Sequence, residues 1–175
     1  MKQRIKENAP DYVLWMLVSA ALVALDQITK TLAVKDLQTE PKENFIPYLF
    51  NLVYPENKGA AWGMLADQRW IFITVSTAAV VLIAFALLLW AKEKPLFCIS
   101  LALILAGGVG NMIDRVSLGY VVDFIQFAFF TSFPIFNGAD SFVTVGGVMM
   151  ICYILFTKDN VFFRNDKNKK KENES

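Results

Sequence analysis

Four long apolar segments place the strongest constraint on how this chain can fold. They cover about residues 12–34, 70–91, 96–113 and 139–156. A helix of about 17–25 mostly apolar residues is long enough to cross a bilayer. Overall, 55% of the residues are hydrophobic and 19% are charged, whereas a soluble domain usually carries more charge. The sequence therefore predicts a membrane protein built on a bundle of four transmembrane helices.

Lysine and arginine are distributed unevenly between the two sides of this bundle. They gather before residue 7, between residues 92 and 94, and after residue 157. Because basic flanking segments remain on the cytoplasmic side, both termini are predicted to be cytoplasmic. We expect residues 1–165 to form one integral membrane domain and residues 166–175 to form a disordered basic tail. The net charge of +1 gives no general field that would attract a nucleic acid.

Two segments remain on the opposite, extracytoplasmic side. The first, about residues 35–69, contains the aromatic and β-prone run 45–54, followed by small residues within 57–63. The second contains the run 121–127, which is too short to span a membrane and is expected to be extended. The predicted fold class is thus an all-α membrane bundle of four transmembrane helices with a small extracytoplasmic β-rich cradle.

Several polar residues lie inside or at the edges of the apolar segments, where ionisable groups are costly and usually functional. Asp26 and Lys30 are four residues apart, so they share one helix face and can pair. Asn111, Asp114 and Arg115 also share one face, at the end of the third segment. A structural ion pair is the simpler explanation for Asp26 and Lys30. The pair Asp114 and Arg115 fits a structural or a substrate-positioning role equally well.

Two further aspartates are predicted at the same depth. Asp140 follows Asn137 at the start of the fourth segment, which suits a helix N-cap and a carboxylate near the positive end of the helix dipole. Asp123 lies in the apolar stretch 121–125, with no cation beside it in the sequence. The predicted topology brings both aspartates, from separate segments, to the extracytoplasmic face.

The absence of histidine from the chain narrows the chemistry available to these residues. It excludes Ser-His-Asp triads, Cys-His dyads and His-ligated zinc. Two carboxylates can instead share one proton, because like charges at short distance do not both ionise easily. The ionised carboxylate then accepts a proton from an attacking water, and the protonated one donates to the amide carbonyl. We therefore predict that Asp123 and Asp140 form an aspartic-protease dyad, in which the helix start favours Asp140 as the ionised member.

Other interpretations remain open from the residues alone. A transporter or proton channel also places carboxylates in the membrane, although it favours the midplane and repeated spans. Ser141 and Lys30 could form the pair of a Ser-Lys protease, and a carboxylate-bound divalent metal is a third alternative. A purely structural membrane scaffold leaves Asp123 unexplained.

Four motifs along the chain resemble those of the bacterial lipoprotein signal peptidases, also called signal peptidase II. The motifs are Asp26-Gln27-Ile28-Thr29-Lys30, Asn57 to Gly63, Gly110 to Ile125, and Phe133 to Ser141. Each motif alone is modest support, but all four in order are specific, and together they extend from the first apolar segment to the fourth. Trp62 is a departure, since phenylalanine is commoner there in the family.

The resemblance implies an aspartic endopeptidase that removes the signal peptide of prolipoproteins, just before the diacylglyceryl-modified cysteine. It implies that Asp123 and Asp140 are catalytic. The residues implied to bind substrate or to orient the pair are Asn57, Asn111, Arg115 and Asn137. The residues implied to support the site are Asp26, Lys30, Gly59 and Asp114.

The same resemblance also implies where and with what the protein works. It implies a multi-pass protein of the bacterial cytoplasmic (inner) membrane, with its active site on the extracytoplasmic side. Membrane lipid and a diacylglyceryl-modified prolipoprotein are the expected partners, globomycin-type cyclic peptides are expected inhibitors, and the protein is expected to be a monomer. We expect no cofactor and no metal.

Overall fold

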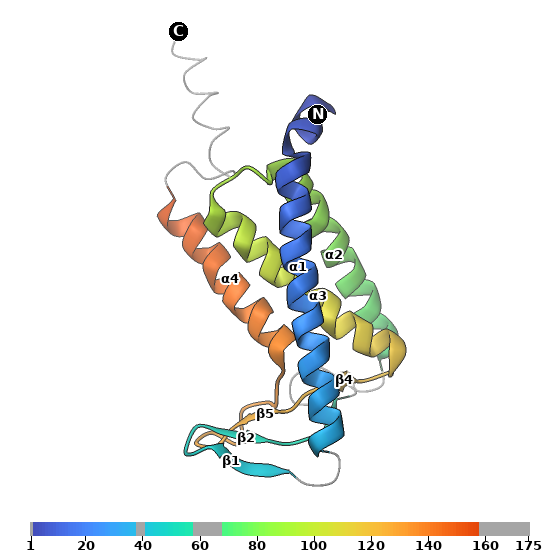
Figure 1. The fold of residues 1–175 in the computed structure, drawn as a ribbon, viewed down its shortest axis with the longest axis vertical. Coiled ribbons are helices and arrows are strands. Elements are labelled where there is room, and N and C mark those ends of the chain that lie inside the picture. The colour runs from blue at the N-terminus through green and yellow to red at the C-terminus, as the bar shows by residue number, and fades with distance from the viewer. Residues whose placement is uncertain (1, 38–40, 58–67, 158–175) are drawn as a thin grey trace.

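The computed structural model describes residues 2–37, 41–57 and 68–157. Within these ranges it contains four α-helices and two small antiparallel sheets (Figure 1). The helices are α1 (Lys2–Leu37), α2 (Arg69–Trp90), α3 (Pro95–Ser117) and α4 (Gly138–Phe156). The strands are β1 (Lys42–Ile46), β2 (Phe50–Leu52), β3 (Glu56–Asn57), β4 (Val121–Val122) and β5 (Ile125–Phe127). All four helices are long and apolar enough to cross a membrane, so the predicted fold class is confirmed.

Helix α3 is the central element of the bundle and packs against each of the other three helices. Half of its apolar span is buried inside the protein, compared with 17% or less for the other spans. Large side chains on those helices point outward, such as Leu17, Leu82 and Leu155, which are 63%, 68% and 69% exposed. Lipid tails are as apolar as leucine, so these faces suit contact with a bilayer.

Glycines let α3 and α4 approach closely. A Cβ atom added to Gly146 would lie 2.8 Å from the carbonyl oxygen of Ser100, and one added to Gly107 would collide with the carbonyl oxygen of Ala139. Small residues at such contacts allow helix backbones to pack closely in membranes. This packing holds the first turn of α4 against the C-terminal half of α3.

The chain reverses direction directly after α3. The backbone amides of Leu118 and Gly119 donate to the carbonyl of Asp114, at 2.7 and 3.3 Å. Gly119 has a φ of +90°, a left-handed conformation that glycine adopts without steric cost. Strand β4 begins two residues later, so this turn carries the chain from α3 to Asp123.

The two segments predicted to lie outside the membrane pair with each other to form the sheets. Strands β1, β2 and β5 form one sheet in that order, and β3 pairs with β4 in the other. Phe50 lies opposite Phe127 in the first sheet, and Asn57 lies opposite Val121 in the second. Both sheets lie at the end of the bundle opposite the N-terminus (Figure 1).

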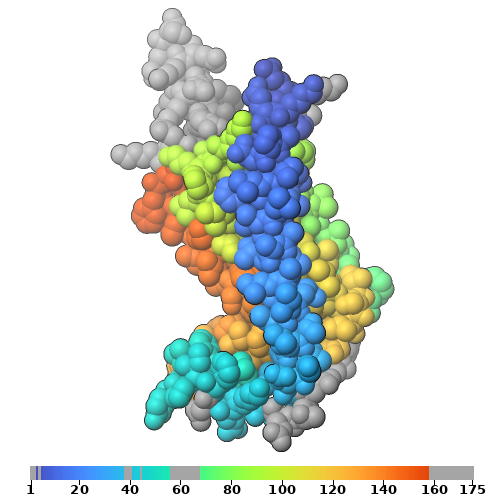
Figure 2. Space-filling model, viewed as in Figure 1, coloured from blue at the N-terminus to red at the C-terminus, as the bar shows by residue number. Residues whose placement is uncertain are grey.

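The larger sheet projects sideways from the bundle. In Figure 2 the surface is hollowed between α4 (orange) and the sheet (teal), beside the C-terminal half of α1 (blue). The start of α4 and the end of α1 therefore both face the underside of the sheet.

Candidate active site

A lysine buried between two carboxylates joins α1 to α3. The Nζ atom of Lys30 lies 2.9 Å from Oδ2 of Asp26 and 2.9 Å from Oδ2 of Asp114. All three residues are at most 2% exposed. An unpaired buried charge is costly, so each member of this triad depends on the others. The pair expected from the i, i+4 spacing of Asp26 and Lys30 is present, and α3 adds Asp114 to it.

The two carboxylates of the triad also hold neighbouring backbone in place. Oδ1 of Asp26 accepts a hydrogen bond from the amide of Ala139 at 2.9 Å, in the first turn of α4. Oδ2 of Asp114 accepts one from the amide of Val122 at 3.1 Å, in β4. The triad thus ties the elements that carry Asp140 and Asp123 to the same point of the bundle.

Gln27 also belongs to this network. Its Nε2 atom donates to Oδ1 of Asp114 at 2.9 Å and to the carbonyl of Gly110 at 3.2 Å. Gln27 lies within the first motif, and no role was predicted for it. The available signal was a polar side chain directly beside Asp26 in an apolar segment, because such a residue needs a partner inside the protein.

Lys30 determines which way the amide of Asn111 points. Nζ of Lys30 donates to Oδ1 of Asn111 at 2.9 Å. A lysine ammonium can only donate hydrogen bonds, so the amide oxygen must face Lys30 and the amide nitrogen must face away. That nitrogen, Nδ2, donates to Oδ1 of Asp140 at 2.7 Å. The orientation of this hydrogen bond to Asp140 therefore follows from the donors that face the amide oxygen, Nζ of Lys30 and, at 3.0 Å, Nδ2 of Asn137.

Asn137 connects the two predicted catalytic aspartates. It is fully buried and caps α4, with Oδ1 accepting from the amide of Asp140 at 2.9 Å, while Oδ2 of Asp140 accepts from the amide of Asn137 at 3.1 Å. The cap turns Nδ2 of Asn137 toward Asp123, whose Oδ1 accepts from it at 2.7 Å. The same nitrogen lies 3.0 Å from Oδ1 of Asn111. One asparagine side chain thus contacts both aspartates.

The segment that carries Asp123 is held by backbone hydrogen bonds on both sides. The amide of Phe124 donates to the carbonyl of Phe136 at 3.1 Å, and the amide of Val53 donates to the carbonyl of Phe124 at 3.1 Å. Asp123 is 2% exposed, whereas Asp140 is half-buried. The more accessible carboxylate is therefore the one at the helix start.

Arg115 lies at the edge of the network. Its guanidinium group stacks 4.8 Å above the ring of Phe72, and Nη1 donates to the carbonyl of Asn111 at 3.4 Å. Stacking leaves other guanidinium N–H groups able to bind a carbonyl or carboxylate.

Two of the predicted site residues are described only in part or not at all. The backbone of Asn57 lies in β3 opposite Val121, two residues before Asp123. Gly59 lies outside the described residues. The remaining predicted residues converge on one network at the sheet end of the bundle, as described above for Asp26, Lys30, Asn111, Asp114, Arg115, Asp123, Asn137 and Asp140.

The donors and acceptors of this network suit acid–base chemistry. Two carboxylates from different elements both accept hydrogen bonds from Asn137, Asp123 from its side chain and Asp140 from its backbone amide. Positioned carboxylates, one of them partly accessible, can act as general acid and general base. Among the described residues, no group of three His, Cys, Asp or Glu side chains is arranged to hold a metal ion. The position between Asp26 and Asp114 is filled by the ammonium group of Lys30.

Solved bacterial membrane enzymes are similar to this chain in fold. One, determined by the in meso method at 2.3 Å, is 32% identical with a TM-score of 0.72, and the match covers 83% of this chain and 88% of that one. A second, determined at 1.9 Å, is 31% identical with a TM-score of 0.73, and the match covers 83% and 94%. The fold and the site together define a multi-pass membrane enzyme.

Sequence relatives identify the kind of enzyme. The family model described as signal peptidase (SPase) II matches residues 18–156. The lipoprotein signal peptidase of Caldanaerobacter subterraneus subsp. tengcongensis is 41% identical over 141 residues, covering 81% of this chain and 95% of the relative. That of Brevibacillus brevis is 39% identical over 147 residues, covering 83% and 98%. The chain therefore belongs to the signal peptidase II family.

Proposed function

We propose that this protein is an aspartic endopeptidase that removes the signal peptide of prolipoproteins, with Asp123 and Asp140 as its catalytic pair. The observation that carries this proposal is the side chain of Asn137, which holds Asp123 by a 2.7 Å hydrogen bond and caps the helix whose first turn contains Asp140. The substrate is proposed from the name shared by the relatives, lipoprotein signal peptidase.

The two carboxylates have different surroundings, which suits different roles. Asp140 accepts hydrogen bonds from Nδ2 of Asn111 and from the amide of Asn137, and it lies in the first turn of α4. Donated hydrogen bonds and the positive end of a helix dipole both favour a negative charge. We therefore assign Asp140 as the ionised carboxylate and Asp123 as the one that carries the shared proton.

Hydrolysis then proceeds in two proton transfers. Ionised Asp140 takes a proton from water as the water oxygen bonds to the carbon of the scissile amide. Protonated Asp123 donates a hydrogen bond to the carbonyl oxygen, where negative charge develops. Asp140 then gives that proton to the amide nitrogen as the tetrahedral intermediate collapses. The C–N bond breaks, the carbonyl forms again, and the pair returns to its starting charge with Asp140 ionised and Asp123 protonated. Arg115 and Asn57 are proposed to hold the substrate backbone.

The proposed setting follows from the charge distribution. Lysine and arginine near both ends of the chain favour cytoplasmic termini, which puts the network on the extracytoplasmic side of the bacterial cytoplasmic membrane. A lipid-modified cysteine keeps the substrate's cleavage point at the same depth. We propose that the enzyme acts as a monomer in lipid and that globomycin-type peptides inhibit it.

The test is cleavage of a diacylglyceryl-modified prolipoprotein by the purified protein in detergent. Asp123→Asn and Asp140→Asn should each lower kcat by at least about 10²–10⁴-fold, since each removes an acid–base group. Asp11→Asn is the matched control, because the side chain of Asp11 is 41% exposed and pairs with Lys92 only at 4.0 Å. Full activity in either active-site variant refutes the proposed pair.

Further measurements distinguish the proposed aspartic mechanism from a Ser-Lys protease, a metal enzyme and a proton channel. Ser141→Ala should retain activity, because Ser141 donates to the carbonyl of Asn137 at 3.1 Å as part of the helix start and has no role in the aspartic mechanism. Loss of activity in that variant, with activity kept in Asp140→Asn, favours a Ser-Lys protease. Activity that a chelator abolishes favours a metal enzyme, and proton flux through liposomes without peptide cleavage favours a channel.

A further inference from the structure

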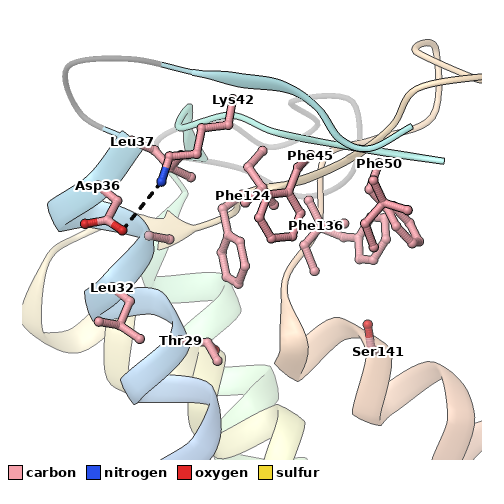
Figure 3. Close-up of a pocket in the computed structure, with 14 residues that line it drawn as sticks. Thr29, Leu32, Asp36, Leu37, Lys42, Phe45, Phe50, Phe124, Phe136 and Ser141 are labelled. Carbon is pink, nitrogen blue, oxygen red and sulfur yellow. Dashed lines mark ion pairs between the residues drawn. The ribbon is translucent and has the colours of Figure 1, made fainter. Parts of the chain in front are cut away.

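Two lysines at the sheet end of the bundle have anionic partners. Lys30 lies between two carboxylates in the polar network. Beside that network, under the larger sheet, lies an apolar cavity of about 570 Å³ (Figure 3). Its charged lining residues, Asp36 and Lys42, pair with each other at 3.6 Å and are about half exposed (Figure 3). The charges in these two places therefore need no further partner.

Arg69, the first residue of α2, differs from these lysines. Its Nε atom is buried and has no hydrogen-bond partner, and among the buried side-chain nitrogen and oxygen atoms of the described residues it is alone in this. An unpaired buried donor is rare and costly. Arg69 therefore lacks an acceptor that a bound ligand can supply.

The guanidinium group of Arg69 is located by contacts on two sides. Its Cζ atom lies 5.2 Å from the centroid of the Trp70 ring. Its Nη1 atom lies against the turn that follows α3, because a Cβ atom added to Gly119 would be 3.5 Å away. Arg115 also stacks on a ring of α2, but it has a backbone carbonyl of α3 as an acceptor. Arg69 is thus held between α2 and the turn with hydrogen-bonding capacity left over.

The charge at this point defines the class of ligand. A guanidinium group is always protonated and can only donate hydrogen bonds. No side chain caps α2 at Gln68, and the first turn of the helix contains no acidic residue. The positive end of the helix dipole therefore adds to the charge of Arg69. Both favour an anion with several acceptor oxygens, such as a phosphate group.

The position of Arg69 indicates where such a phosphate comes from. Arg69 begins a helix that is long and apolar enough to cross a membrane. Trp70 is 72% exposed, and exposed tryptophan at the end of a span is typical of the membrane–water interface, where lipid head groups lie. Further along α2, Ile71 and Val75 are also exposed, so the surface below Arg69 suits lipid tails.

We propose that Arg69 binds the phosphate of an anionic phospholipid, whose tails lie along the outward face of α2. A zwitterionic lipid also brings a cation, for which the first turn of α2 offers no carboxylate. Because Arg69 contacts the turn at Gly119 that leads to β4, a bound lipid holds the start of α2 against that turn. Binding therefore stabilises the folded protein, and this inference does not depend on the proposed peptidase activity.

Thermal unfolding of the detergent-purified protein tests the inference. The unfolding temperature is titrated with dioctanoyl phosphatidylglycerol, dioctanoyl phosphatidylcholine or inorganic phosphate, and each protein is compared with itself without ligand. Phosphatidylglycerol should raise the unfolding temperature of the wild type more than either of the others at the same concentration. Arg69→Gln should weaken the apparent affinity for phosphatidylglycerol at least about tenfold, because it removes charge-assisted hydrogen bonds to the phosphate.

Lys35→Gln is the matched control. Lys35 is an exposed cation in the last turn of α1, which ends at the same side of the bundle. Its replacement should change the apparent affinity by no more than about twofold, as exposed substitutions usually do. Equal weakening in Arg69→Gln and Lys35→Gln overturns the site, as does unchanged affinity in Arg69→Gln. Equal stabilisation by phosphatidylcholine overturns the preference for an anionic lipid, and equal stabilisation by inorganic phosphate assigns Arg69 to a free anion instead.

Photo-crosslinking locates the lipid in the wild-type protein and does not depend on the folding of a variant. Phosphatidylglycerol with a diazirine in one tail is activated in mixed micelles, and the labelled residues are identified by mass spectrometry. Labels on Trp70, Ile71 or Val75 that excess phosphatidylglycerol suppresses, and excess phosphatidylcholine does not, support the site. Labels spread evenly over the outward faces of all four helices refute it.

Discussion

Replacing Lys30 by methionine tests the triad most directly. The substitution keeps an unbranched side chain but removes the charge that lies 2.9 Å from both Asp26 and Asp114. It also removes the donor that turns the amide of Asn111 toward Asp140. Stability and catalysis should therefore both change, for separate physical reasons.

The expected loss of stability follows from burial. Removing one partner of a buried ion pair typically costs about 3–5 kcal/mol, because the remaining charge is left uncompensated. Here two carboxylates lose their cation, and both are at most 2% exposed, so the upper part of that range applies. A loss of about 5 kcal/mol is a large share of the roughly 5–15 kcal/mol that stabilises a typical domain.

Lys42→Met is the matched control for this variant. It removes the cation of the Asp36 pair, which is longer, at 3.6 Å, and about half exposed on both sides. Solvent screens such pairs, so the expected cost is at most about 1 kcal/mol. Thermal unfolding in detergent can be followed with a thiol-reactive dye in a Cys152→Ser background, since Cys98 is fully buried and Cys152 is only partly buried. Lys30→Met should unfold at a clearly lower temperature than Lys42→Met.

Catalysis is measured in the same samples, well below the unfolding temperature. Without Lys30 the amide oxygen of Asn111 keeps only Nδ2 of Asn137 as a donor, at 3.0 Å. The amide then rotates more easily, and rotation removes the 2.7 Å hydrogen bond to Asp140. We expect kcat of the folded protein to fall while KM changes little. Equal unfolding temperatures for Lys30→Met and Lys42→Met would refute the stabilising triad. A destabilised variant with wild-type kcat would refute the proposed control of the Asn111 amide.

Two further substitutions address the packing of the network. Gly110→Ala should destabilise the protein by about 1–3 kcal/mol or more, because its Cβ would lie 2.5 Å from Oδ2 of Asp26. Gly108→Ala, whose Cβ would meet only Val80 at 3.4 Å, should be tolerated, and similar unfolding temperatures for the two would contradict this explanation. Asn137→Ala should cost about 0.5–2 kcal/mol through loss of the helix cap, and should lower kcat further because Asp123 loses its 2.7 Å donor. Near-wild-type kcat in Asn137→Ala would show that catalysis does not need the contacts of the Asn137 side chain with Asp123 and Asp140.

Features with short sequence separation were predictable. Four apolar runs of sufficient length indicated four spans, and the i, i+4 spacing of Asp26 and Lys30 indicated a shared helix face. Asn137 and Asp140 indicated a capped helix start, which the structure contains in full. In each case the geometry of a single helix decides the outcome, so periodicity and end signals are sufficient.

Contacts between distant segments were harder to predict. The residues alone left two roles open for Asp114 and predicted none for Gln27. In the structure, Asp114 of α3 pairs with Lys30 of α1, and Gln27 donates to Asp114. The pairing of β2 with β5 was also not specified. These contacts depend on how each helix is rotated against its neighbours, which the sequence of one helix does not determine.

The sequence by itself thus determined the spans, their apolar faces and the family to which the motifs point, because local backbone geometry and bilayer thickness leave few alternatives. The tertiary structure alone decided that Lys30 orients Asn111, that Asn137 contacts both Asp123 and Asp140, and that an apolar cavity lies beside them. The physical reason is that glycine-mediated packing of α3 against α4 and strand pairing across the chain set these distances. Neither leaves a periodic signal within any one segment.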